Sequence, residues 1–236
     1  MNQDPYGAMP HLLSTSARQE NTPIPYRIEG ELVPVLHIAL QNLPIYFEHY
    51  VLLYKSPQVQ ISIKPLGNLG KRLLSGMPIF VTQATGVGQI AFSRDGAGQV
   101  FSLHLQSGQE IDVREHAFLA ATDNVDYTWQ RVKGVSNILF GGTGFFIDRF
   151  QCRQDEGVLW LHGYGNVFEL VLAPGEAIDV EPGGWLYKDP TVEMQTVMQP
   201  LSTGFFASAS SFTFNRFTGP GRLGLQSMYL AMDTGT

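Results

Sequence analysis

The sequence predicts an all-β protein made of three consecutive copies of one β-sandwich module. Three observations lead to this fold class: an internal repeat of about 66 residues, apolar residues that alternate along short segments, and turn residues at short intervals. Short half-buried strands joined by Gly- and Pro-containing turns are typical of sandwiches and barrels, not of alternating strands and helices.

The repeat is found by comparing the chain with itself. Three runs that begin at Ile45, Ile111 and Ile178 align without a gap, at offsets of 66 and 67 residues. The same offsets bring residues 145–150 onto residues 212–217, which were not used to set them. Agreement in several separate segments makes a chance match implausible, so we expect like segments to adopt like shapes.

The repeat also sets the expected domain boundaries. The three modules are predicted at residues 27–93, 99–163 and 166–232. Residues 1–26 precede the first copy and are polar and Pro-punctuated, which is typical of a flexible N-terminal arm.

Alternation and turns define the strands within each copy. Apolar residues occupy every second position in residues 101–105, as expected for a half-buried strand. Helix is expected only where apolar clusters end in glycine, at residues 66–76 and 135–142, with a shorter equivalent at 201–206. Less than about a tenth of the chain should therefore be helical.

A single copy buries too little apolar surface to fold stably alone, so the copies should pack together. A pseudo-threefold cluster is favoured over a linear stack. A stack would leave strand edges open, and the low charge of the chain offers little to protect them.

Composition restricts the classes of function. The chain has 236 residues, 44% hydrophobic and 15% charged, and a net charge of −6 without a basic run, which disfavours nucleic acid as a partner. The lone Cys152 excludes an internal disulfide and a cysteine-based zinc site. No secretory h-region and no long apolar span are evident, so we expect a cytoplasmic protein that is not secreted and does not cross a membrane, although it could lie at a membrane surface.

Several segments together resemble a known family. They are residues 30–38, 70–76, 117–121, 163–165 and 216–221, which include Lys-Arg-Leu-Leu and Phe-Thr-Gly-Pro-Gly. They look like the altered-inheritance-of-mitochondria family, concerned with mitochondrial biogenesis, in its bacterial form. The resemblance implies a sandwich fold like that of the tryptophan RNA-binding attenuation protein, and it brings no catalytic residues.

Motifs for catalysis or cofactor binding are weak. The six histidines form neither an H-x-H pair nor an H-E-x-x-H helix, so a cupin-like metal site would depend on folding to gather them. Gly86-Val-Gly88 matches part of a dinucleotide fingerprint but joins two expected strands, so it predicts a turn. We therefore expect no cofactor and no catalytic or metal-binding residues.

Two arginines recur at equivalent positions, Arg149 in the second copy and Arg216 in the third, where the first copy has Gln83. They could form a paired anion site. A structural guanidinium that binds loop carbonyl groups is the commoner role.

The most suggestive functional feature is a candidate interaction patch in the Gly-rich connections, where polar residues are usual. Its residues are Leu69, Lys71, Arg72, Leu73, Leu74, Ile138, Leu139 and Phe140. If exposed, they would serve self-association or a membrane surface. Alternatively, they fold back and plug the ends of the sandwiches.

The sequence therefore favours a non-enzymatic scaffold or interaction protein, whose partner is a second copy, another protein or a membrane surface. A cupin-like small-molecule or metal-binding protein is the first alternative. RNA binding by analogy of fold is the second, and fold analogy alone does not transfer function.

Overall fold

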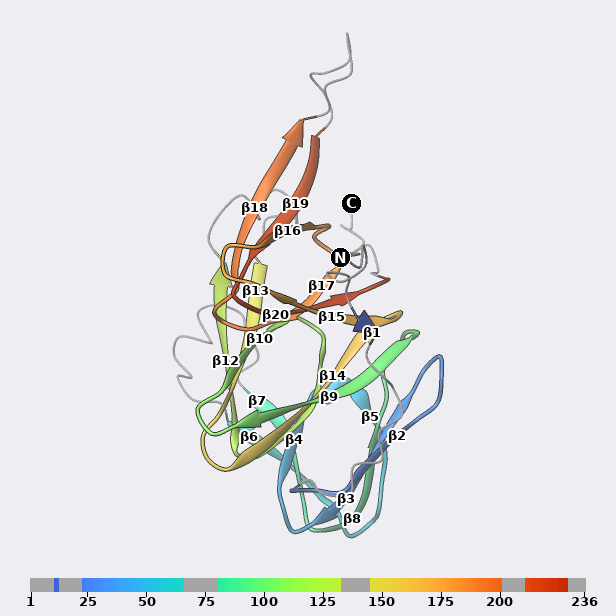
Figure 1. Cartoon of the computed structure of the whole chain (residues 1–236). Helices are drawn as coiled ribbons and strands as arrows, with labels where there is room; N and C mark the ends of the chain where they lie inside the picture. Colours follow the sequence, from blue (N-terminus) through green and yellow to red (C-terminus); the bar gives the residue numbers. More distant parts are fainter. Residues whose placement is uncertain (1–10, 13–22, 66–79, 133–144, 201–210, 229–236) are drawn as a thin grey trace, which may run out of the picture.

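The computed structural model describes residues 11–12, 23–65, 80–132, 145–200 and 211–228 (Figure 1). Twenty β-strands run through these residues. The described residues hold no α-helix, only the short 3-10 helix η1 at His49–Val51. The all-β class is confirmed, while the helical turns predicted at 66–76, 135–142 and 201–206 lie outside the described residues.

Eighteen of the strands fall into three successive sets of six, which we call modules 1, 2 and 3. Module 1 contains β3 (Val35–Gln41), β4 (Ile45–Phe47), β5 (Leu52–Lys55), β6 (Gln60–Pro65), β7 (Phe80–Thr85) and β8 (Val87–Phe92). Module 2 contains β9 (Gly98–Gln106), β10 (Glu110–Arg114), β11 (Phe118–Thr122), β12 (Val125–Val132), β13 (Phe145–Cys152) and β14 (Glu156–Tyr164). Module 3 contains β15 (Val167–Leu172), β16 (Ala177–Val180), β17 (Trp185–Lys188), β18 (Glu193–Pro200), β19 (Ser211–Thr218) and β20 (Gly221–Gln226).

The strands pair in the same way in all three modules. The sixth strand lies between the first and the third, and the fifth lies between the second and the fourth, always antiparallel. The register also repeats, because Ile45, Ile111 and Ile178 all face the fifth strand, opposite Ala84, Phe150 and Phe217 respectively. The three runs aligned in the sequence therefore follow the same strand pairing.

Neighbouring modules are joined edge to edge. Strand β4 of module 1 pairs with β11 of module 2, and β10 of module 2 pairs with β17 of module 3. These two junctions create a six-stranded and a seven-stranded sheet, flanked by a four-stranded sheet that ends at β5 and a three-stranded sheet that ends at β16. In the described residues β5 and β16 belong to different sheets and do not pair.

The modules consequently form a row. Figure 1 shows the strands of module 1 at one end of the molecule and β18 and β19 of module 3 at the other. A pseudo-threefold cluster would need a third equivalent junction between β16 and β5. The predicted pseudo-threefold arrangement is therefore not confirmed, because the edge-to-edge pairing joins the modules in a row that does not close in the described residues.

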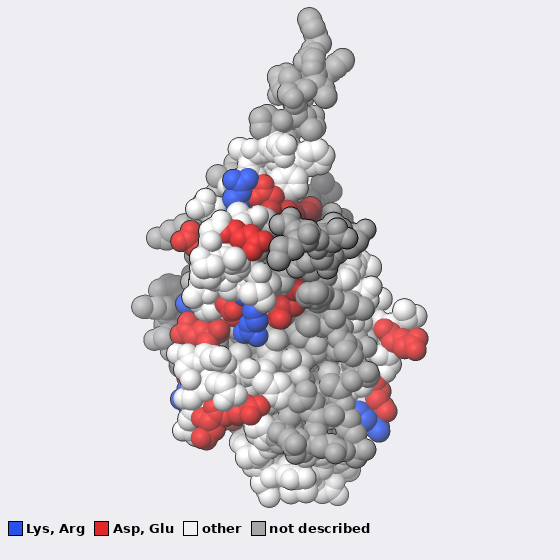
Figure 2. All heavy atoms as spheres, viewed as in Figure 1, with Lys and Arg blue, Asp and Glu red and all other residues white. Residues whose placement is uncertain are grey.

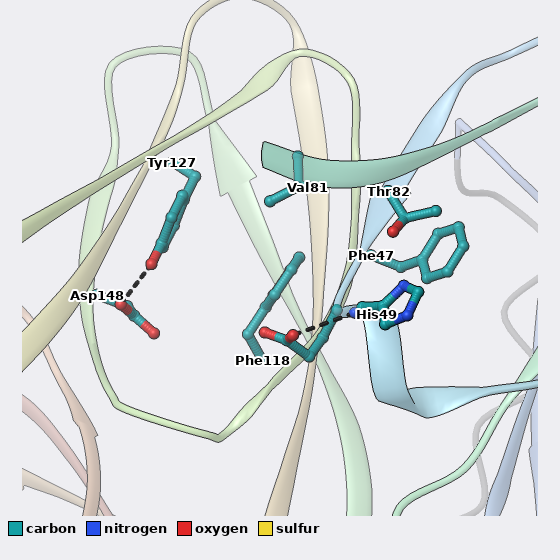
Figure 3. Close-up of a pocket in the computed structure, with 8 residues that line it drawn as sticks. Phe47, His49, Val81, Thr82, Phe118, Tyr127 and Asp148 are labelled. Carbon is teal, nitrogen blue, oxygen red and sulfur yellow. Dashed lines mark hydrogen bonds between the residues drawn. The ribbon is translucent and has the colours of Figure 1, made fainter. Parts of the chain in front are cut away.

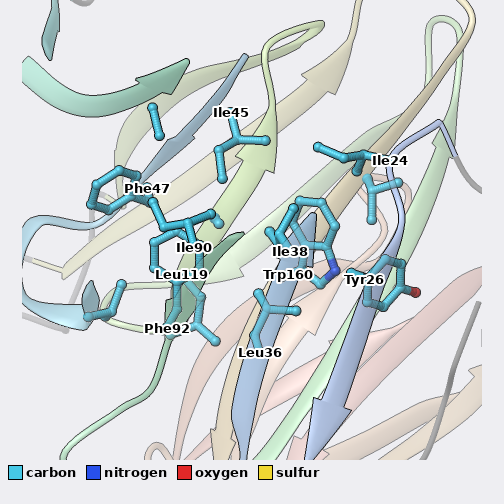
Figure 4. Packing of buried hydrophobic residues seen from close by; sticks show 14 of the residues in the cluster. Ile24, Tyr26, Leu36, Ile38, Ile45, Phe47, Ile90, Phe92, Leu119 and Trp160 are labelled. Carbon is cyan, nitrogen blue, oxygen red and sulfur yellow. The ribbon is translucent and has the colours of Figure 1, made fainter. Parts of the chain in front are cut away.

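The hydrophobic core is shared between modules. Trp160 and Leu119 of module 2 pack in one buried cluster with Phe47 and Phe92 of module 1, as Figure 4 shows. A second cluster joins module 2 to Leu186 and Tyr187 of module 3, and a third lies mainly in module 3 but includes Ile147 of module 2. Apolar burial thus supports the same junctions as the strand pairing.

One glycine recurs because the sandwich leaves no room for a side chain. Gly157 on β14 faces Leu105, and a Cβ atom there would lie 2.4 Å from Cγ2 of Val125. Gly88 and Gly221 stand at the equivalent places in modules 1 and 3. Such contacts are too short for a methyl group, so the position requires glycine.

The segment predicted as a flexible arm contacts the fold at two places. His11–Leu12 forms β1, which pairs with β15 at Glu169 and Phe168. Ile24 is fully buried in the first core cluster, and β2 (Tyr26–Glu29) extends the sheet beside β3. These parts of the arm therefore belong to the sandwich. No helix in the described part of the chain is long and apolar enough to cross a membrane.

Candidate functional site

A buried group of charges lies at the junction between modules 2 and 3. The Asp112 carboxylate on β10 accepts hydrogen bonds from Arg149 Nε at 2.6 Å and Arg149 Nη2 at 3.0 Å. Lys188 Nζ, on β17 across the junction, donates to Asp112 Oδ2 at 2.9 Å and to the Val192 carbonyl oxygen at 2.9 Å. Asp112 is completely buried and Lys188 almost so, whereas the Arg149 side chain is partly exposed, so the contact between Asp112 and Lys188 is shielded from bulk water.

The two hydrogen-bonded groups Asp112 and Arg149 shift each other's pKa toward the charged form. Burial alone would raise the pKa of Asp112, but hydrogen bonds from Arg149 and Lys188 outweigh it and hold the pKa below its ordinary value. The hydrogen bond to Asp112 in turn raises the pKa of Arg149. A carboxylate held ionised between two cations is suited to fastening strands together, not to moving protons.

Module 3 repeats the same ion pair at its open edge. Asp179 on β16 accepts from Arg216 Nε and Nη2, both at 2.7 Å. Both side chains are partly exposed. In the described residues β16 pairs only with β19, so its other edge has no neighbouring strand. The Arg149 and Arg216 predicted as a paired anion or structural site are thus each bound to a carboxylate of their own module.

The junction between modules 1 and 2 is apolar at the equivalent place. Tyr46 on β4 lies opposite Ala121 on β11, and the Tyr46 ring packs 5.5 Å from that of Phe118. Burial of Tyr46 raises the pKa of its hydroxyl well above the ordinary value. Two junctions with one register therefore use different chemistry.

Within the described part of the chain, the third strand of module 1, β5, pairs with no strand of another module. All four residues of β5 are exposed, with Leu53 at 56% and Tyr54 at 42%. The equivalent strands β11 and β17 are buried along their whole length. An exposed apolar edge strand is a ready site for pairing with another chain.

A chain of polar side chains crosses the ladder between β9 and β14. Glu156 Oε1 lies 2.5 Å from His104 Nδ1, while the Tyr26 hydroxyl lies 2.7 Å from Ser102 Oγ and 3.4 Å from His104 Nε2. A carboxylate, a histidine and a serine suggest nucleophilic catalysis, but Tyr26 stands between the histidine and the serine. The geometry instead ties β2 to module 2.

Figure 3 shows a pocket between modules 1 and 2. It is lined by Phe47, Glu48, His49, Val81, Thr82, Phe118, Tyr127 and Asp148. The Tyr127 hydroxyl donates to Asp148 at 2.8 Å, and Glu48 accepts from the His49 backbone N–H. Three of its polar side chains, Glu48, Tyr127 and Asp148, are therefore engaged with the protein itself.

The histidines are dispersed. His37 bonds to the Tyr54 hydroxyl at 2.8 Å, His116 is exposed, and His162 is buried beside Tyr164. Within the described ranges, no three His, Cys, Asp or Glu side chains come together in a way that could hold a metal ion. Gly86 forms the turn between β7 and β8, as the sequence predicted.

The patch predicted from the sequence lies outside the described residues. Its members fall within 66–79 and 133–144, so it stays a prediction. Sequence reasoning instead missed the open strands β5 and β16. The alignment held a signal for them, because Leu53-Tyr54-Lys55 repeats the Leu186-Tyr187-Lys188 that forms a buried junction strand.

Surface charge is scattered. On the face drawn in Figure 2, acidic and basic side chains are interspersed over a mainly uncharged surface, without a basic stripe. That face offers no electrostatic footprint for a phosphate backbone.

Comparisons with other proteins agree with the fold. An uncharacterised protein of Streptococcus pyogenes serotype M6 is 26% identical over 221 residues, which cover 86% of this chain and 85% of that protein. The crystal structure of protein SPYM3_0169 from Streptococcus pyogenes superposes with a TM-score of 0.65 at 23% identity, covering 87% of this chain and 94% of that one. Residues 26–228 match the sequence model of the family described as Mitochondrial biogenesis AIM24. The chain therefore belongs to the AIM24 mitochondrial biogenesis family.

Proposed function

We propose that the protein is a non-enzymatic scaffold that binds proteins by adding their extended strands to the open edges of its sheets. The observation that carries the proposal is the exposure of β5, an edge strand with apolar side chains whose second side pairs with no strand that the structure describes. Strand addition satisfies backbone hydrogen bonds and buries such side chains at the same time.

The chemistry of the polar clusters supports a binding role over a catalytic one. Asp112 is held ionised by two cations, and the His104 and Asp148 groups are hydrogen-bonded within the protein. Catalysis requires groups that converge on a space a substrate can occupy.

Action in the cytoplasm, with contact to a membrane surface, belongs to the same proposal. It draws on the single, buried Cys152 and on the basic and apolar residues of the sequence-predicted patch, Lys71, Arg72 and Leu73 among them. Flotation with phosphatidylglycerol vesicles tests the membrane part. Loss of flotation in a Lys71→Ala/Arg72→Ala variant supports it, and a wild-type protein that stays with the soluble fraction contradicts it.

The scaffold function is tested by selecting extended peptides from a displayed random library against the purified chain. Selected peptides should slow amide hydrogen exchange in β5, with the matched buried strand β17 as the internal control. Peptides that leave exchange in β5 unchanged, or a library that yields no binder, would contradict strand addition.

A further inference from the structure

The two junctions inside the chain obey one rule. The second strand of a module pairs antiparallel with the third strand of the next module, and the register is the same each time. Tyr46 lies opposite Ala121 at the first junction, and Asp112 lies opposite Lys188 at the second. These are equivalent pairs in the repeat. The junction is thus a property of the module and not of one place in the chain.

The rule leaves one strand of each kind unused. Module 1 has the third strand β5 and module 3 has the second strand β16, and neither pairs across a junction in the described residues. The fourth strands, β6, β12 and β18, end their sheets in every module. Only β5 and β16, among the strands that the structure describes, therefore depart from the pattern of their equivalents.

The unused strands carry the sequences that form the polar junction. There, Asp112 and Val113 of the run Ile-Asp-Val on β10 pair with Lys188 and Tyr187 of the run Leu-Tyr-Lys on β17. Strand β16 repeats the first as residues 178–180, with the same Ile-Asp-Val, and β5 repeats the second as residues 53–55, with the same Leu-Tyr-Lys. Each half of the contact is therefore present at one end of the row, on β5 or on β16, without a partner strand in the described residues.

Local contacts hold both halves in the junction conformation. The Asp179–Arg216 ion pair reproduces Asp112–Arg149, with two hydrogen bonds in each case. The Tyr54 hydroxyl bonds to His37, which occupies the place of Glu169, the acceptor for Tyr187. Preorganised edges lose little conformational freedom on pairing.

We propose that β16 of one copy pairs antiparallel with β5 of a second copy, with Asp179 opposite Lys55 and Val180 opposite Tyr54. The Lys55 ammonium group then joins the Asp179–Arg216 pair as Lys188 joins Asp112 and Arg149. The contact covers the apolar side chains of β5, which are exposed in the single chain. This deepens the proposed function by naming the partner as a second copy of the chain.

The contact is head-to-tail. Each added copy brings a further open β5 or β16, so assembly continues until a ring closes or the ends are capped. The mass of the particles should therefore rise with protein concentration.

Reversing one charge on each surface tests the pairing. Lys55→Glu places a carboxylate against Asp179 of the neighbour, and Asp179→Lys places two cations against each other, since Lys55 stands opposite. Each variant alone should associate at least about tenfold more weakly than the wild-type chain, because like charges face each other. Lys55 is exposed, so the dilute Lys55→Glu variant should unfold like wild type. Asp179→Lys also breaks the partly exposed ion pair with Arg216 and should lower the melting temperature only slightly.

Mixing the two variants is the decisive measurement. The carboxylate introduced at position 55 of one variant faces the ammonium group introduced at position 179 of the other, and the remaining surfaces are wild type. Analytical ultracentrifugation should therefore show assembly restored in the mixture. Arg27→Glu and Glu193→Lys, which change exposed charges by the same amount elsewhere, should assemble like wild type.

Three results would overturn the pairing: a wild-type chain that stays monomeric at every concentration, variants that assemble like wild type, or a mixture that stays dissociated. If peptides still slow exchange in β5, the proposed function survives such a result and only the identity of the partner is wrong. If peptides also fail to bind, both proposals fall.

Discussion

Lys188 Nζ lies 2.9 Å from Asp112 Oδ2, and this contact joins two modules through side chains that are almost completely buried. Arg149 from the neighbouring strand binds the same carboxylate. Removal of the carboxylate would leave the buried Lys188 without its counterion, and the partly exposed Arg149 would keep only the more distant Glu110. An uncompensated buried charge costs much more than the pair itself contributes.

Asp112→Ala should therefore lower the free energy of unfolding by about 3 to 5 kcal/mol. Urea denaturation followed by tryptophan fluorescence measures it. The matched control is Asp179→Ala, which removes the equivalent carboxylate at an exposed position and should cost far less because Arg216 stays hydrated. Equal losses in the two variants would show that the buried position of Asp112 does not matter.

The three equivalent leucines should differ in the same way. Leu119→Ala and Leu186→Ala remove fully buried side chains and should each cost about 2 to 5 kcal/mol. Leu53→Ala, at the open edge, should change the stability of the dilute chain by less than about 0.5 kcal/mol. A large loss for Leu53→Ala would mean that β5 is covered within a single chain.

Stability should fall as the solution is acidified, because of His162. Burial lowers the pKa of His162 from its ordinary 6.5 to about 4. Between these values the unfolded chain binds a proton that the folded chain does not, so the stability present above pH 6.5 declines down to pH 4. The loss amounts to about 3 kcal/mol.

Urea denaturation across this pH range checks the His162 contribution. His162→Gln should have a flatter profile between the two pKa values, whatever its stability at neutral pH. The low pKa of Asp112 acts separately, since its contribution is lost only when the pH falls below the ordinary range of a carboxyl group. A profile unchanged by His162→Gln would contradict the assignment.

Gly157→Ala should destabilise the chain by about 1 to 3 kcal/mol, because the new methyl group overlaps Val125. A Val125→Ala change in the same chain should cost less than it does alone, as the overlap is then relieved. Thermal or urea unfolding of the two single variants and the double variant measures the coupling. If the losses of stability in the two single variants add up to the loss in the double variant, the overlap with Val125 is not the cause of the destabilisation.

The sequence predicted the strands well, because burial leaves a periodic trace. Ile45 and Ile111 are both completely buried at the same register position, and side chains of this kind make the repeat visible. Alternation reports which residues are covered, but not which part of the chain covers them. The pairing of β4 with β11 and of β10 with β17 therefore could not be derived from the pattern.

The candidate site was harder to predict from the sequence, again because the sequence pattern does not tell which strands become neighbours. Tyr54 and Tyr187 stand in nearly identical sequences, yet the first is exposed and the second is buried, since only β17 has a neighbour across a junction in the described residues. The partner of Arg149 was also hidden, because Asp112 precedes it by 37 positions. Likewise, the two residues of β1 are too few to show any period.

The shared sheets also determine how the chain comes apart. The six-stranded sheet contains strands of modules 1 and 2, and the seven-stranded sheet contains strands of modules 2 and 3. Melting of any one module would strip its neighbour of a ladder partner and open its core to water. The three repeats are therefore a single cooperative unit, and a protein cut between β14 and β15 would yield two fragments that each lack part of their own interior.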